Sequence, residues 1–120
     1  MAQPDDGVLV AGLERAGVRL VLVATGGGSA AIPRLLTTPG ASAVVVEALV
    51  PYARAAVDRL LGGPQESYGS TRTARRLAMA AWQRALEPGI PAERAVGAAV
   101  TAALRSREPK RGDHRVLVAV

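Results

Sequence analysis

The sequence predicts an α/β protein with three layers, an α/β/α sandwich in which helices cover both faces of a central sheet. Short runs rich in valine and leucine alternate with longer segments of helical periodicity. The 120 residues suffice for one hydrophobic core, and 49% of them are apolar. We therefore expect a single domain that spans residues 1–120.

The first fifty residues predict two helices and two strands. A helix begins near Asp5 or Asp6, which are placed to cap it. Residues 18–24 are aliphatic, largely β-branched and bounded by glycine, which is typical of a buried strand. A short helix is expected over 30–36 and a second strand over 42–50. The apolar stripe expected on the first helix consists of Val8, Leu9, Leu13 and Ala16.

The remaining residues predict two more helices and two more strands. A helix over 51–61 ends at a Gly-Gly-Pro sequence, and the longest helix, 70–86, begins at a serine that caps it. Residues 94–101 predict a third strand, although their alanine content leaves a helix as an alternative. A polar, basic loop over 105–113 precedes a last strand over 116–120.

Composition excludes several kinds of site. The chain has no cysteine and a single histidine, His114, so disulfides, thiolate centres and multi-histidine metal sites are excluded, and we expect no metal or cofactor. The acidic amino terminus is not a signal peptide, and no apolar run is long enough to cross a bilayer. We therefore expect a cytoplasmic protein without a membrane partner.

The formal charge of +5 raises the question of nucleic-acid binding. Arginine carries almost all of it, and a biased genome composition explains that excess as well. The basic stretch near the carboxyl end contains acidic residues and no aromatic residues that would stack on bases, so a solvated loop is favoured over a nucleic-acid site. This stretch contains Arg105, Arg107, Lys110, Arg111, His114 and Arg115.

The strongest local signal is a glycine-rich junction between the strand at 18–24 and the following helix. Three glycines allow backbone N–H groups to approach a ligand, and a helix start favours an anion. A glycine turn without ligand is an equally good interpretation. A dinucleotide site, with Glu47 as the ribose ligand, fits a loose Gly-x-Gly-x-x-Ala pattern and is less favoured. The candidate ligand-binding residues are Gly26, Gly27, Gly28 and Ser29.

Thr25 stands at the carboxyl end of this strand, where a nucleophilic hydroxyl would be well placed. Such a hydroxyl needs a base to activate it. His114 is remote in sequence and no lysine lies nearby. A capping or turn role for Thr25 is therefore the favoured reading from the residues alone.

Four segments, read in order, resemble one family. They are residues 16–20, the Pro-Gly-Ala-Ser block within 34–44, Tyr52 with Leu-Leu-Gly at 60–62, and the helix entry and helix at 68–81. The chain resembles, from about residue 9 to 120, the C-terminal domain of the CinA family of competence- and damage-inducible proteins. The resemblance implies relation to enzymes that deamidate nicotinamide mononucleotide.

The resemblance also implies an altered catalytic site. It places Thr25 where the family has a nucleophilic serine, and Val57 where the family's Tyr-Ser-Asn-x-x-Lys sequence, here beginning at Tyr52, has its catalytic lysine. Thr101 is retained from the family's ligand loop, but the glycines after it are not. Thr25, Tyr52 and Thr101 are thus the candidate catalytic residues of an eroded site with little or no activity, and whether the chain is an enzyme stays open.

A non-catalytic module that binds a nucleotide or a protein is the alternative. The family continues beyond the strand at 116–120 into one more strand and a closing helix, which this sequence lacks. A second copy of the chain would cover the sheet edge left there, so we expect a homo-oligomer. The expected small ligand resembles nicotinamide mononucleotide.

Overall fold

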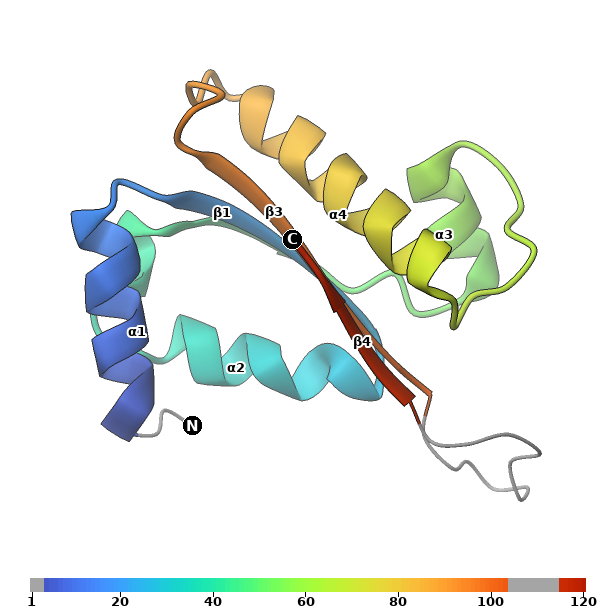
Figure 1. The fold of residues 1–120 in the computed structure, drawn as a ribbon, viewed down its shortest axis with the longest axis horizontal. Coiled ribbons are helices and arrows are strands. Elements are labelled where there is room, and N and C mark those ends of the chain that lie inside the picture. The colour runs from blue at the N-terminus through green and yellow to red at the C-terminus, as the bar shows by residue number, and fades with distance from the viewer. Residues whose placement is uncertain (1–3, 104–114) are drawn as a thin grey trace.

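A computed structural model describes residues 4–103 and 115–120 and shows four strands between two layers of helices (Figure 1). Helices α1 and α2 cover one face of the sheet, and α3 and α4 cover the other. The predicted three-layer α/β/α arrangement is confirmed. The helices are α1 (Pro4–Arg15), α2 (Ala31–Leu36), α3 (Arg54–Leu61) and α4 (Thr71–Leu86), and the strands are β1 (Arg19–Gly26), β2 (Val45–Leu49), β3 (Ala95–Ala103) and β4 (Arg115–Ala119).

The sheet has the strand order β2-β1-β3-β4. β1 pairs in parallel with both β2 and β3, whereas β4 pairs antiparallel with β3. The connection after β1 leads through α2 to β2 on one side, and the connection after β3 leads to β4 on the other side. Ligands of open α/β sheets bind where connections diverge in this way, at the carboxyl ends of the strands. In this fold that position lies between β1 and β3.

The main core lies between the sheet and α4. Buried side chains of β1, such as Val21 and Val23, pack against Leu77 of α4 and against the alanines of β3. Gly97 brings the two elements closest, because a Cβ atom there would lie 2.2 Å from the Ala78 carbonyl oxygen of α4. The alanine-rich segment is therefore a strand, as predicted, and its helical alternative is wrong.

The second core is smaller and lies under α1, where the predicted stripe is partly wrong. Val10 is buried with Leu20 of β1, and Leu13 packs against them. Val8 and Leu9, which the prediction placed in the stripe, are 73% and 58% exposed. The continuous apolar run from Val8 to Val10 contains a hydrophobic residue on several helical faces, so the spacing alone does not decide which face docks.

Several predicted boundaries shift. α1 already begins at Pro4, so Asp5 and Asp6 lie in its first turn instead of capping it. Asp6 forms an ion pair with Arg34 of α2 over 2.9 Å. β2 starts at Val45, later than predicted, because residues Ala41–Ala43 form a 3-10 turn. The predicted basic loop, 105–113, lies outside the described residues, and no helix within the described part is long and apolar enough to span a membrane.

Candidate functional site

A pocket of about 240 Å³ opens at the carboxyl ends of β1 and β3, beside the starts of α3 and α4. It lies at the divergence of connections that the topology identifies as the expected ligand position. The three side chains predicted as catalytic, Thr25, Tyr52 and Thr101, all line it. The other lining residues are Gly26, Arg54, Val57, Tyr68, Gly69, Thr73 and Leu77.

The two threonines reach the pocket because of strand alternation. Val21 and Val23 of β1 pack in the core beneath α4, and Thr25 follows with the same two-residue period. Ala99 and Thr101 continue the corresponding row of β3. Thr25 and Thr101 are paired in the parallel register of β1 and β3. Their side chains therefore lie next to each other, each following the core residues of its own strand.

Neither threonine hydroxyl has a hydrogen-bond partner among the described residues. This matters most for Thr101, whose residue is only 4% exposed. Its hydroxyl oxygen is nevertheless not among the fully buried side-chain atoms that lack a partner, and Thr101 lines the pocket, so the pocket reaches this oxygen. The Thr101 hydroxyl is therefore available to a ligand group that enters the pocket.

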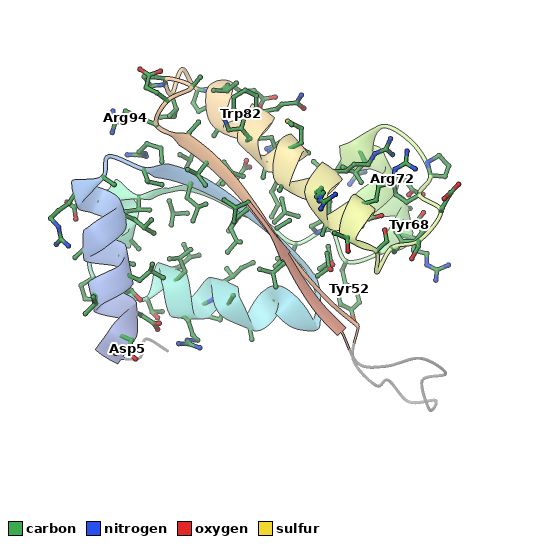
Figure 2. All side chains as sticks on the ribbon, viewed as in Figure 1. Asp5, Tyr52, Tyr68, Arg72, Trp82 and Arg94 are labelled. Atoms are coloured by element: carbon green, nitrogen blue, oxygen red, sulfur yellow. The ribbon has the colours of Figure 1, made fainter. Side chains whose placement is uncertain are left out.

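Tyr52 and Val57 form contrasting parts of the pocket. Tyr52 is 77% exposed and lies at the rim, as Figure 2 shows near the starts of α3 and α4. Val57, on α3, is 5% exposed and belongs to the main core while also lining the pocket. The side chain at the position that the resemblance assigns to a lysine is thus an aliphatic wall.

The glycine-rich segment contributes less to the pocket than the sequence suggests. Only Gly26 lines it, and its φ of 57° lies in the region that favours glycine. Gly28 is needed for packing, because a Cβ atom there would lie 2.7 Å from a methyl group of Val100. Gly27 and Ser29 are not among the lining residues, since Gly27–Ala30 turn away in a 3-10 helix before α2.

Two pocket residues, Arg54 and Tyr68, belong to a network with Asp58 that the sequence analysis did not single out. The Tyr68 hydroxyl donates a hydrogen bond to Asp58 Oδ1 over 2.5 Å, and this bond raises the pKa of Tyr68 above its usual value. The Arg54 guanidinium lies 5.1 Å from the centroid of the Tyr68 ring. The sequence held no signal for this network, because the irregular chain over 62–70 brings Tyr68 back to α3.

Glu47 is engaged elsewhere and does not line the pocket. It lies within β2, opposite Val21, and accepts two hydrogen bonds of 2.7 Å from the Arg84 guanidinium of α4. This hydrogen bonding lowers the pKa of the Glu47 carboxyl. The predicted dinucleotide pattern with Glu47 as ribose ligand is therefore not supported by the geometry. No group of three His, Asp or Glu side chains within the described chain is arranged to hold a metal ion.

Comparison with known proteins identifies the fold. Neither a protein-family model nor a curated protein matches the sequence. Among solved structures, a competence-damaged protein (CinA) superfamily protein from Escherichia coli matches with a TM-score of 0.68 and 15% identity, covering 95% of this chain and 73% of that one. A CinA superfamily protein from Enterobacter cloacae matches with a TM-score of 0.69 and 16% identity, and the match covers 95% of this chain and 75% of that one. This chain has the CinA-superfamily fold.

A third structure extends the match to almost the whole chain. The competence/damage inducible protein from Agrobacterium tumefaciens has a TM-score of 0.65 at 20% identity, and the match covers 99% of this chain and 81% of that one. The CinA-like fold therefore includes the sheet, both helix layers and the strand ends that hold Thr25 and Thr101. The identities lie too low to carry residue roles from these proteins to this chain.

Proposed function

We propose that this chain is a CinA C-terminal-like protein that binds a small nucleotide in the Thr25–Thr101 pocket and has little or no amidohydrolase activity. The observation that carries the proposal is Val57. It lines the pocket, is 5% exposed, and stands where the resemblance assigns the catalytic lysine. The proposed ligand is of the nicotinamide mononucleotide type, and the cytoplasm stays the predicted compartment.

The described lining of the pocket offers Thr25 no side chain that would act as a general base. No Asp, Glu, His or Lys is among the described residues that line it. The Arg54 guanidinium offers N–H donors and no acceptor, so it does not serve as a base. The Tyr68 hydroxyl donates a hydrogen bond to Asp58, and this bond raises the pKa of Tyr68, so the phenol keeps its proton. Because general-base assistance contributes roughly 10²–10⁴-fold in rate, amide hydrolysis through Thr25 is expected to be slow or absent.

Ligand binding is better supported than catalysis. The pocket remains open beside Val57, with a volume of about 240 Å³ and two hydroxyls without partners. Pockets for small ligands commonly measure ~300–1,000 Å³. A cavity slightly below that range accommodates one end of a mononucleotide, while the remainder would extend over the exposed Tyr52 ring at the rim.

Ammonia release from nicotinamide mononucleotide tests the catalytic part of the proposal. The native protein is expected to release none above the rate of a Thr25→Ala control. A Thr25→Ser/Val57→Lys variant, which restores both side chains of the resembled family, is expected to gain activity. Native activity that Thr25→Ala abolishes would refute the eroded site. Calorimetric titration of the native protein with the same nucleotide tests the binding part, and an absence of heat would refute it.

The second candidate function, assembly of the chain into a homo-oligomer, rests on a separate observation. Of the described residues, β4 pairs only with residues 99–103 of β3, which leaves the edge over 95–98 without a strand partner on that side. An apolar hollow of about 500 Å³ lies beside this edge and includes Met79, which is 56% exposed, and Trp82. An unpaired edge next to exposed apolar surface favours pairing with a second copy.

Light scattering at increasing protein concentration tests the assembly. We expect a dimer in the native protein and a monomer in Met79→Lys. Leu36→Lys is the matched control, because Leu36 is 50% exposed on α2, on the opposite layer of the sandwich. A native monomer at every concentration, or a dimer that both substitutions leave intact, would refute assembly through this edge.

A further inference from the structure

Arg54 places a positive charge at the pocket and has no acidic partner among residues 4–103 and 115–120. It is the first residue of α3 and lines the pocket. Asp58 lies one turn later on the same helix, at the spacing where an arginine and an aspartate commonly pair. Yet the described residues contain no ion pair between Arg54 and any carboxylate. The charge of Arg54 is therefore not neutralised within the described chain.

Tyr68 keeps the two charges apart and fixes the position of Arg54. Its ring lies beneath the guanidinium, 5.1 Å from centroid to Cζ, while its hydroxyl donates to the Asp58 carboxylate over 2.5 Å. A cation over an aromatic face is held by the ring quadrupole and retains its N–H donors for other partners. The contact with the ring favours this position of Arg54, and its N–H donors make no hydrogen bond to another described residue.

The rest of the pocket suits an anion as well. Its described lining residues include no acid, and α3 begins there without a side-chain cap, so the positive end of the helix dipole is not satisfied locally. The independent observation is Thr101, which is 4% exposed and has no hydrogen-bond partner. Its hydroxyl oxygen is not fully buried and belongs to a residue of the pocket wall, so it is open to a polar ligand group in the pocket.

We propose that Arg54 makes this pocket selective for ligands that carry an oxyanion, a phosphate monoester or a carboxylate, with the Thr101 hydroxyl as a second donor. Arg54 precedes Val57 by one helical turn, and both residues line the pocket. The resemblance assigns a lysine to position 57, where this chain has valine. Arg54 supplies a positive charge one turn earlier, and a guanidinium binds anions but does not act as a base. This inference rests on the proposed ligand-binding function and specifies its ligand class.

Two probes that differ only in a phosphate group test the selectivity. Nicotinamide mononucleotide and nicotinamide riboside are titrated calorimetrically into the native protein and into Arg54→Gln. We expect the native protein to favour the mononucleotide, and Arg54→Gln to bind it ~10-fold to ~100-fold more weakly with little change for the riboside. Arg54→Lys retains the charge and is expected to retain part of the preference.

Arg59→Gln is the matched control, because Arg59 lies on the same helix and is exposed but does not line the pocket. It removes the same charge and is expected to leave both affinities unchanged. Displacement of the mononucleotide by inorganic phosphate, compared with acetate, distinguishes a phosphate site from a carboxylate site.

The outcomes separate this inference from the proposed function. Equal affinities for the two probes in the native protein, or equal losses in Arg54→Gln and Arg59→Gln, would overturn the role of Arg54 while ligand binding stands. Binding of neither probe would overturn both. A Thr101→Val variant that weakens mononucleotide binding while its thermal unfolding matches the native protein would support the second donor, and native affinity in that variant would overturn it.

Discussion

Gly97 of β3 is expected to be the glycine least tolerant of substitution, because α4 packs directly on its Cα. A methyl group there would lie 2.2 Å from the Ala78 carbonyl oxygen, 2.3 Å from the Trp82 nitrogen and 2.8 Å from the Trp82 Cα. All three are backbone atoms of α4, so no side-chain rotation relieves the clash and the helix itself has to move. Overpacking a core usually costs about 1–3 kcal/mol.

For Gly97→Ala we expect the upper end of that range, about 3 kcal/mol of unfolding free energy. Typical domains are stable by only ~5–15 kcal/mol, so the variant loses a large share but remains foldable. At ~3–6 °C per kcal/mol for a chain of this size, the melting temperature falls by ~10 °C or more. Since α4 also supplies Leu77 to the pocket, ligand affinity should fall together with stability.

Urea unfolding followed by circular dichroism and by the fluorescence of Trp82 measures the effect. Gly12→Ala is the control, because its Cβ would lie within 4 Å only of the Arg15 side chain, and alanine is favoured in the interior of α1. That variant should gain ~0.5–1 kcal/mol. A Gly97→Ala protein within ~1 kcal/mol of the native protein would refute the close approach of α4 to β3.

Two smaller effects follow from the hydrogen bonds of α4. Because Arg84 lowers the pKa of Glu47, the contribution of their pair is present above the unfolded-state pKa of the carboxyl and is lost as pH falls through the lower folded-state pKa. The two side chains are 37% and 35% exposed, so the pair is worth about 1 kcal/mol or less. Urea unfolding of Glu47→Gln should therefore differ from that of the native protein at pH 7, and the two should converge once the pH has fallen below the folded-state pKa of Glu47. A difference that persists at the lower pH would contradict this origin. The Ser70 hydroxyl accepts a hydrogen bond of 3.1 Å from the Thr73 N–H. Ser70→Ala should therefore lower the unfolding free energy by ~1 kcal/mol, and Ser70→Gly by only a few tenths of a kcal/mol. Equal losses for the two variants in thermal melts would contradict the capping role.

The elements that the sequence predicted well are those with a local cause. The serine cap of α4 and the buried strand β1 have signals within a few residues, and both are present. β3 was ambiguous because alanine has low strand propensity, and its conformation follows from tertiary packing. Small residues at Ala95, Gly97 and Ala99 are what allow α4 to lie so close to the sheet. The alanine content that suggested a helix is thus a consequence of being a strand under a closely packed helix.

The candidate site shows the same division. That Thr25 ends a buried strand is a local property, and the resemblance to a known family drew attention to Tyr52 and Thr101. The structure brings all three to one pocket, while their catalytic roles stay predictions. The contact between Arg54 and Tyr68 at the pocket forms because the irregular segment 62–70 leads the chain back to α3. No local sequence pattern predicts this path.

The shape of the pocket and its chemistry depend on different residues. The pocket exists because two core rows end at Thr25 and Thr101 under α4, so the packing that stabilises the fold also maintains the cavity. Its chemistry depends on individual lining side chains, such as Val57, which also belongs to the main core, and Arg54, which is exposed. Val57 contributes an aliphatic side chain to the core, and the cavity beside it stays open. Under the function proposed above, the chain lacks catalysis but keeps its binding site. The Thr25→Ser/Val57→Lys variant tests this when its thermal unfolding is measured beside its activity, because Val57 is 5% exposed and a lysine there places a charge in the core.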